Sequence, residues 1–317
     1  MNILASFSEY TDTNTPLVVV LGTFDGFHKG HQSLLCQAHK LAEKQEAKVA
    51  IVTFSAHPMQ VLNPSQQPLT ICQDWEKKRI EEDLGVSIVF SLPMSTKLLQ
   101  VTAASFMEAL WHLPLAGLVV GENFTFGKGG LGTPDQLIAY GKKWQTPVVI
   151  SPLLVDKKAG RPISSTWIRQ LIIKGDLEEA RRLLGRPFMF RGEIIHGDER
   201  GRTLGFPTLN FLLPKELAVP PDGVYANRIY LGGSWYNGVG NIGDNPTFSN
   251  QYYRCEVHVF DFNQNVYGQE AVVTFEKQLR GEVKFASLAE LVAQMALDKQ
   301  KAREYLAMLE PVDLSIS

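Results

Sequence analysis

The chain has little cysteine, no marked excess of charge of either sign and no long apolar run. Its 317 residues include three scattered cysteines, Cys36, Cys72 and Cys255, which exclude a disulfide or zinc framework and predict small buried side chains. A formal net charge of −2 excludes a strongly basic surface for nucleic acid or acidic lipid. No apolar run reaches membrane-spanning length, and no basic-then-apolar leader is present. These absences predict a cytoplasmic protein without nucleic-acid or membrane partners.

The first part of the chain alternates short apolar runs with helical patterns. This alternation predicts an α/β fold, a doubly wound parallel sheet with ligands at the carboxyl ends of its strands. Strands are expected at residues 17–21, 49–54, 87–92, 118–121 and 147–151. Helices are expected at residues 32–44, 74–84, 105–113, 134–144, 166–174 and 177–184.

The pattern changes at the Gly-Arg-Pro sequence of residues 185–187. Short β-rich runs punctuated by Gly, Pro and Asn follow, which predicts a small antiparallel β-barrel. A long terminal helix is expected to start at Ser287, with Glu290 completing a capping box, and to stop at Pro311. We therefore predict two domains, residues 1–185 and 186–317. A homo-oligomer is compatible with this composition.

Two histidines stand where the first predicted strand turns into a helix. A turn at residues 22–26 follows the strand, and His28 and His31 then open the helix. Backbone N–H groups and the positive end of a helix dipole make such a place an anion site. Side chains three residues apart share one helix face, so both imidazoles can donate to a phosphate during nucleotidyl transfer. The alternative is a pair of capping or metal-binding histidines, although further metal ligands are missing nearby.

Four stretches in order resemble the motifs of the bacterial bifunctional riboflavin kinase/FAD synthetase family. They are residues 22–32 (GTFDGFHKGHQ), 121–127 (GENFTFG), 163–169 (ISSTWIR) and 201–210 (GRTLGFPTLN), and the resemblance runs from about residue 16 to about residue 306. It implies an N-terminal FMN adenylyltransferase domain and a C-terminal riboflavin kinase domain. The first transfers AMP from ATP to FMN, giving FAD and pyrophosphate. The second phosphorylates riboflavin with ATP and Mg²⁺.

In the adenylyltransferase domain, the resemblance makes His28 and His31 the groups that stabilise the transition state. It implies ATP contacts from Gly22, Phe24, Asp25, Gly30, Asn123, Ser165, Thr166 and Arg169. Residues 123 and 125 are Asn and Thr where the family commonly has Asp and Arg, which puts the affinity for the nucleotide in question. Ordinary helix capping also explains residues 164–166. His57 and Pro58 resemble the flavin-side loop, and a simple turn is the alternative.

In the kinase domain, the resemblance assigns the phosphates of the nucleotide to Gly197, Arg202, Gly205 and Thr208. Thr208 and Asn210 would supply oxygen ligands to Mg²⁺, which suits a hard cation. Glu256 would be the base that takes the proton of the 5′-hydroxyl, whereas a solvated surface glutamate is the alternative. His258 and His196 are expected to be structural.

Two other functions remain open at this point. In the first, the chain has kept only one of the two activities. In the second, it is a flavin-binding regulator that catalyses no reaction. The formation of ADP and pyrophosphate from riboflavin, ATP and Mg²⁺ distinguishes them from a bifunctional enzyme.

Overall fold

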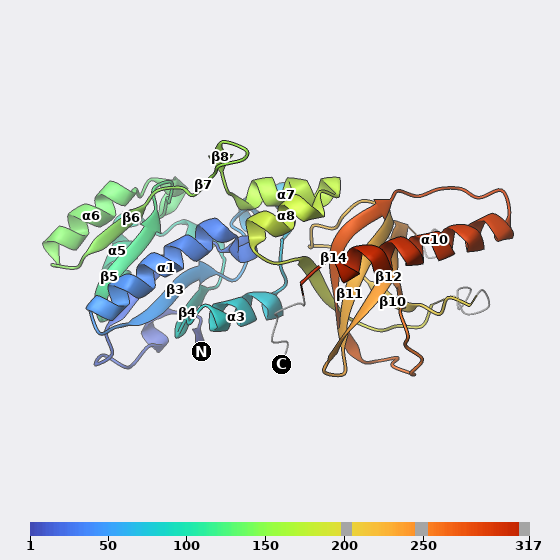
Figure 1. Cartoon of the computed structure of the whole chain (residues 1–317). Coiled ribbons are helices and arrows are strands. Elements are labelled where there is room, and N and C mark those ends of the chain that lie inside the picture. Colours follow the sequence, from blue (N-terminus) through green and yellow to red (C-terminus); the bar gives the residue numbers. More distant parts are fainter. Residues whose placement is uncertain (198–204, 245–252, 311–317) are drawn as a thin grey trace. The chain divides into compact units, whose positions relative to one another are not determined.

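The computed structural model describes residues 1–197, 205–244 and 253–310, and its contacts divide the chain into two compact units (Figure 1). Unit 1 comprises Met1–Pro68 and Asp74–Ser164, and unit 2 comprises Leu69–Gln73 and Ser165–Ser317. The helices predicted at residues 166–174 and 177–184 thus belong to unit 2, whereas the division predicted from the sequence places them in the first domain.

Unit 1 is built on a parallel sheet of six strands in the order β1-β4-β3-β2-β5-β6. The strands are β1 (Asn2–Leu4), β2 (Leu17–Leu21), β3 (Lys48–Phe54), β4 (Ile88–Leu92), β5 (Leu115–Gly121) and β6 (Val148–Ser151). The order changes direction at β2, which pairs with β3 on one side and β5 on the other. Ligands of doubly wound sheets bind outside the carboxyl ends of the strands at this point. The residues that follow β2 therefore stand where a ligand is expected.

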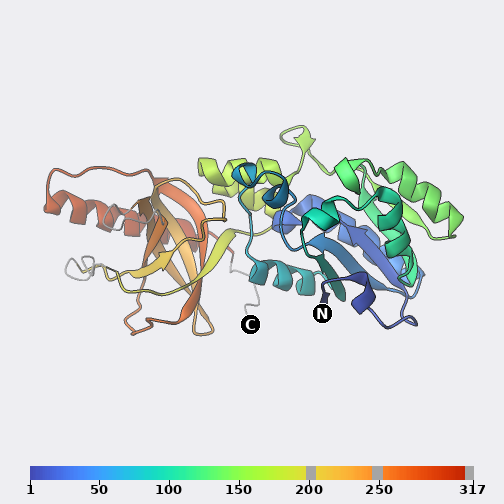
Figure 2. The same cartoon turned by 180° about the vertical axis from the view of Figure 1, so that it is seen from behind.

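Different helices cover the two faces of this sheet (Figures 1 and 2). Val18 and Val20 of β2 belong to the core beneath α1 (Lys29–Lys44) and α3 (Asp74–Asp83). The alternate residues of β2 pack beneath α5 (Ala103–Trp111) and α6 (Pro134–Lys143). Because β2 is buried on both faces, its sequence is continuously apolar rather than alternating.

Shorter elements complete unit 1. They are η1 (Phe7–Glu9), η2 (Asp25–Phe27), α2 (Met59–Leu62), η3 (Pro64–Gln66), α4 (Thr96–Leu99), η4 (Lys128–Gly130) and the hairpin of β7 (Val155–Asp156) and β8 (Arg161–Pro162). Sequence reasoning missed β1, a three-residue edge strand parallel to β4.

Unit 2 is an antiparallel sheet of six strands in the order β10-β13-β12-β11-β14-β9, preceded by two helices and followed by one. Its elements are α7 (Ser165–Lys174), α8 (Leu177–Leu184), β9 (Phe188–Glu193), β10 (Leu209–Leu212), β11 (Gly223–Leu231), β12 (Ser234–Asp244), β13 (Tyr253–Val259), β14 (Glu270–Arg280) and α10 (Leu288–Ala307). A bridge between Ile195 and Asn210 joins the two edges of the sheet. The fold class expected for both parts of the chain is confirmed.

The terminal helix starts where the sequence predicts. The Ser287 side chain accepts a hydrogen bond from Glu290 N at 3.2 Å. The return bond of the capping box comes from Ala286 N to Glu290 rather than from Ser287 N, so the expected box is shifted by one residue. Ala302 and Leu306 then pack against Ala226 of β11. Pro311, the expected stop, lies outside the described residues.

The cysteines are free, and one prediction about them is wrong. Cys72 and Cys255 are buried, as expected, but Cys36 is exposed. Cys36 stands on α1 next to the buried Leu35, so a shift of one position moves its thiol off the face that packs on the sheet.

Helix α8 is tied to the barrel by an ion pair whose carboxylate is buried. Glu276 of β14 is 1% exposed, and Arg181 of α8 donates a hydrogen bond to its carboxylate. Thr274 donates to the other carboxylate oxygen at 2.9 Å. Removing one partner of a buried pair leaves an uncompensated charge, which is more costly than the pair itself is stabilising.

We expect Arg181→Ala to lower the free energy of unfolding of unit 2 by about 3 kcal/mol, because the buried Glu276 then loses its hydrogen-bonded cation and keeps only the neighbouring Arg228. Arg182→Ala is the matched control, since Arg182 pairs with Glu179 on the same helix, and we expect it to cost about 0.5 kcal/mol. Pulse proteolysis across a urea gradient, with cleavage sites in unit 2 assigned by mass spectrometry, measures both. Equal losses in the two variants would contradict the role given to Glu276.

Helix α3 buries a carboxyl group beside the sheet. Glu81 is 5% exposed and lines a cavity of about 240 Å³ together with Thr53 and Ser91. Burial raises the pKa of Glu81 from 4.5 to about 7. Between these values the folded state holds a proton on Glu81 that the unfolded state has released. Protonated Glu81 therefore stabilises the folded state fully below pH 4.5, and this contribution is lost as the pH rises through 7.

We expect unit 1 to lose about 1 kcal/mol of unfolding free energy between pH 6 and pH 8 through Glu81, since a proton is worth about 1.4 kcal/mol per pH unit. Glu81→Gln should remove this loss, and Glu43→Gln, at an exposed position of α1, should retain it. The same urea gradient, followed at sites in unit 1, measures the difference. A pH dependence that survives in Glu81→Gln belongs to another group.

Candidate active sites

The turn after β2 is held in a conformation that its residues rarely adopt. Phe24 and Phe27 have φ values of 50° and 42°, in the left-handed region, and Gly26 has a φ of 81°. The two phenylalanine rings stack at 5.4 Å and are buried, so packing holds their backbone in place. Strain of this kind persists where the surroundings impose it, and it is common at functional sites.

His28 caps the N-terminus of α1. Its Nδ1 accepts a hydrogen bond from His31 N at 3.3 Å, so the ring proton lies on Nε2. The rings of His28 and His31 stack at 3.8 Å, and Phe24 meets the His31 ring edge-on at 5.2 Å. A Cβ atom on Gly30 would come within 3.0 Å of the His28 ring, which explains the glycine between the histidines.

The His31 ring is half-buried and neutral. Among the described residues, its buried Nδ1 has no hydrogen-bond partner. Burial, and secondarily the neighbouring His28, hold the pKa of His31 well below its usual range. A neutral imidazole with an unused ring nitrogen is suited to donate to, or accept from, a bound group at pH 7.

An apolar cavity of about 460 Å³ lies in unit 1. It begins at Gly22 of the turn and includes Pro58, whereas His57 is not among its lining residues. His57 Nδ1 accepts from Met59 N at 3.2 Å, as in a turn before a helix. The other lining residues come from β2, β3, α2, α4, α5, the loops before and after α4 and residues 124–130. Among them are Phe54, Leu62, Met94, Leu98, Phe106, Phe124 and Phe126. Sequence reasoning missed these residues, because apolar side chains of a cavity look like those of a core.

The predicted ATP contacts of the first domain belong to both units. Asn123 is exposed and follows β5, whose carboxyl end lies next to that of β2, so it stands at the same edge of the sheet as His28. Asp25 lies in the turn itself. Ser165, Thr166 and Arg169 belong to α7 of unit 2, where Arg169 Nε donates to Leu69 O at 2.5 Å. Ile163 O lies 3.5 Å from the position of a Cβ on Gly30, so the start of this motif reaches the histidine pair.

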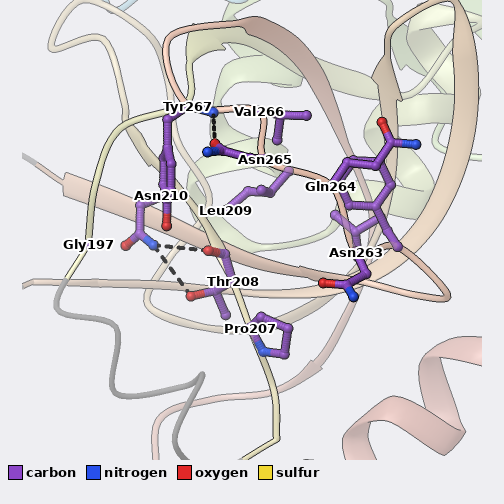
Figure 3. Close-up of a pocket in the computed structure, with 12 residues that line it drawn as sticks. Gly197, Pro207, Thr208, Leu209, Asn210, Asn263, Gln264, Asn265, Val266 and Tyr267 are labelled. Carbon is purple, nitrogen blue, oxygen red and sulfur yellow. Dashed lines mark hydrogen bonds between the residues drawn. The ribbon is translucent and has the colours of Figure 1, made fainter.

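A second site lies in the barrel, where Thr208 and Asn210 line a cavity of about 420 Å³ (Figure 3). Asn210 is 4% exposed, and its Nδ2 donates to the carbonyl and hydroxyl oxygens of Thr208 at 3.4 Å. Its Oδ1 is buried and has no partner among the described residues. Gly197 also lines this cavity, and a Cβ there would overlap the Asn210 amide.

These oxygen atoms fit a divalent cation. A buried amide oxygen without a hydrogen bond costs free energy unless a ligand satisfies it. The Thr208 hydroxyl stands beside the Asn210 amide, and neutral oxygen donors suit hard cations. Thr208 and Asn210 are therefore able to hold such an ion together with phosphate oxygens.

Glu256 lies on β13, the strand that pairs with β10. It is opposite Asn210 in the register of β10 and β13, and opposite Asn241 in that of β13 and β12. Directly opposed residues point to the same face of a sheet. Glu256 is half-buried and lines a separate cavity of about 550 Å³. Among the described residues, Thr208 alone lines both this cavity and the one of about 420 Å³.

Gly205 and Arg202 remain of the predicted kinase-site residues, and His196 and His258 were expected to be structural. Gly205 is exposed with a φ of 81°, which favours glycine. Arg202 lies outside the described residues. His196 stacks on Tyr267, which lines the cavity of about 420 Å³. His258 is 7% exposed, and its pKa is lowered chiefly by burial, against a contact with Pro207 O that raises it.

Comparison with known proteins decides the family. A family model described as riboflavin kinase matches residues 184–306, and one described as FAD synthetase matches residues 10–167. A Bacillus subtilis bifunctional riboflavin kinase/FMN adenylyltransferase is 39% identical over 301 residues, covering 92% of this chain and 93% of its own. The chain belongs to this family. Its Escherichia coli relative of the same name is 35% identical over 93% of this chain and 94% of its own.

One solved structure similar to this family member carries another title. The crystal structure of a "macrolide-efflux protein" from Streptococcus pneumoniae is 35% identical with a TM-score of 0.87, covering 95% of this chain and 98% of its own. Within the described part of this chain, none of the helices has the length and apolar character needed to cross a membrane.

Proposed function

We propose that this chain converts riboflavin to FAD in two steps, one for each site. In unit 2, the γ-phosphoryl group of ATP moves to riboflavin and gives FMN and ADP. In unit 1, AMP moves from a second ATP to FMN and gives FAD and pyrophosphate. The observation that carries the proposal is the position of Thr208 between two cavities, with Asn210 opposite Glu256. A nucleotide in one cavity and a hydroxyl substrate in the other then meet at these residues.

The kinase step needs a positioned acceptor and neutralised phosphates rather than a protein nucleophile. We assign the nucleotide to the cavity of Gly197 and Tyr267, and the flavin to the cavity of Glu256. Glu256 accepts the proton of the ribityl 5′-hydroxyl as the oxygen attacks the γ-phosphorus. Thr208 and Asn210 hold Mg²⁺, which neutralises phosphate charge when it is bound. Gly205 and Arg202 are assigned to the phosphates on the sequence motif alone.

The adenylyl step uses neutral donors at a helix N-terminus. The phosphate of FMN attacks the α-phosphorus of ATP, one P–O bond forms, and the bond to pyrophosphate breaks. Charge grows on the oxygens around phosphorus, where His28 Nε2–H, His31 and the start of α1 stabilise it. The apolar cavity beside Phe54 and Pro58 has the size and character for the flavin ring.

We assign the ATP of this step to Gly22, Phe24, Asp25, Gly30 and Asn123 at this edge of the sheet. Ser165, Thr166 and Arg169 of α7 are assigned to the same ATP on the sequence motif alone. The turn geometry and the nearness of Ile163 O to Gly30 support the first group. Because both reactions consume ATP, we place the enzyme in the cytoplasm, with small-molecule substrates as its partners.

Chromatography of riboflavin, FMN and FAD, together with ADP and pyrophosphate, tests the proposal. The chain is incubated with riboflavin, ATP and Mg²⁺, and a parallel sample receives EDTA. We expect FMN to appear first and FAD to follow, with neither in the chelated sample. FMN without FAD would leave a kinase alone, FAD only from supplied FMN would leave the transferase, and unchanged riboflavin with bound flavin would indicate a regulator.

The proposed domains, residues 1–185 and 186–317, separate the functional residues, but the barrel packs on α8. We therefore expect a fragment of residues 165–317, which contains all of unit 2 except Leu69–Gln73, to phosphorylate riboflavin. A fragment of residues 186–317 lacks Arg181 together with the rest of α8, so it should lose more than about 3 kcal/mol of unfolding free energy and unfold at a lower urea concentration. Urea unfolding and FMN formation by both fragments check this expectation. A shorter fragment of equal stability would show that α7 and α8 are not needed by the kinase domain.

A further inference from the structure

A buried histidine on β13 contacts the segment that leads into β10. His258 Nδ1 lies 2.9 Å from Pro207 O, and its Nε2 lies 3.2 Å from Lys299 Nζ of α10. The Phe206 ring meets the His258 ring edge-on at 5.3 Å. The histidine thus touches the residues directly before Thr208 and also the terminal helix.

The two contacts fix the tautomer of this ring. A carbonyl oxygen only accepts hydrogen bonds, so Nδ1 carries the proton and donates to Pro207 O. A lysine ammonium only donates, so Nε2 accepts from Lys299. Lys299 also lies over the rings of Phe206 and Phe260, at 5.9 and 5.6 Å from their centres. Both ring nitrogens of His258 therefore form hydrogen bonds: Nδ1 donates to Pro207 O, and Nε2 accepts from Lys299 Nζ.

The bond to Pro207 O acts on the place where phosphoryl transfer is proposed. Residues 206–208 have no regular secondary structure, and Gly205 before them has a left-handed backbone. The carbonyl carbon of Pro207 is bonded to Thr208 N, so holding this oxygen fixes the peptide plane from which Thr208 extends. Glu256 stands two residues before His258 and on the same side of the strand. One strand thus carries the proposed base and the anchor of the segment opposite it.

We propose that His258, held by Lys299, is a positioning residue that sets Thr208 relative to Glu256 for phosphoryl transfer. The inference rests on the proposed kinase function. His258 touches no reacting atom and acts through the Pro207–Thr208 peptide. Loss of groups that orient a metal site typically costs about 10- to 100-fold in metal affinity or activity.

Two substitutions separate the two contacts of the ring. Asparagine places an amide N–H near the position of Nδ1, so His258→Asn keeps the donor to Pro207. Glutamine places its amide near the position of Nε2, so His258→Gln keeps a partner for Lys299 and loses that donor. We expect His258→Gln to raise the apparent dissociation constant for Mg²⁺ and the KM for ATP in FMN formation by about 10-fold or more, and His258→Asn to stay within about 3-fold of wild type.

A second pair of variants tests the terminal helix. Lys299→Met should raise the apparent dissociation constant for Mg²⁺ and the KM for ATP by a smaller factor than His258→Gln does, because His258 loses its hydrogen bond from Lys299. Lys301→Met, at an exposed position of the same helix, should leave both constants unchanged. FAD formation from supplied FMN is measured in every variant, and urea unfolding of unit 2 verifies that it is folded.

The outcomes are distinct. Wild-type constants in His258→Gln, or equal losses in the Asn and Gln variants, would overturn the inference while wild-type FMN formation still supports the kinase. A loss of kcat with unchanged constants for Mg²⁺ and ATP would also overturn it. Absence of FMN from the wild-type chain would instead refute the proposed function itself.

Discussion

FAD formation from supplied FMN is expected to fall about 10²- to 10³-fold in His28→Asn, while riboflavin is still converted to FMN. The loss equals that of one transition-state donor, since asparagine has no group at the position of Nε2. Asparagine is also a good N-cap, so its side-chain oxygen can accept from His31 N as His28 Nδ1 does. The variant therefore removes the donor and keeps the helix start. Initial rates of the two reactions measure the separate effects.

Two further variants define this result. His28→Ala removes the cap as well. It should lower the free energy of unfolding of unit 1 by about 0.5–2 kcal/mol. His112→Ala changes an exposed histidine of the same unit and should leave FAD formation unchanged. An undiminished rate in His28→Asn would show that the histidine is only a helix cap, which was the alternative reading of the pair.

The first site illustrates what sequence can and cannot supply. Local sequence patterns indicate the strand, the turn and the helix, so the position of His28 and His31 could be predicted. The left-handed backbone of Phe24 and Phe27 could not, because residues other than glycine adopt it only under the pressure of packing. The cavity walls have no chemical signature of their own, and the fold alone brings Phe54 and Phe106 together.

The division of the chain shows a second limit. The helices at residues 166–174 and 177–184 were predicted, but their membership of unit 2 was not, because the partner of Arg181 lies 95 residues away. A charged residue on an amphipathic helix usually faces solvent, so nothing local marks Arg181 as the partner of a buried carboxylate.

The kinase site depends on register, which sequence alone leaves open. Motif resemblance named Thr208, Asn210 and Glu256. That Asn210 stands opposite Glu256 follows from the pairing of β10 with β13. A slip of one residue would turn one of them to the other face, so this register is what makes a joint function of these residues possible.

Glu256→Gln is expected to lower FMN formation from riboflavin by about 10²- to 10⁴-fold, the usual value of a general base. The amide nearly matches the carboxylate in volume, so the barrel should stay folded, but it cannot take up the proton of the 5′-hydroxyl. Adenylylation of supplied FMN should continue, because its attacking phosphate is already ionised and its site lies in unit 1. Glu193→Gln, at an exposed position of β9, is the matched control and should phosphorylate riboflavin normally. If Glu256→Gln does so too, Glu256 is a solvated residue at the rim of the cavity, and the proton must leave by way of water.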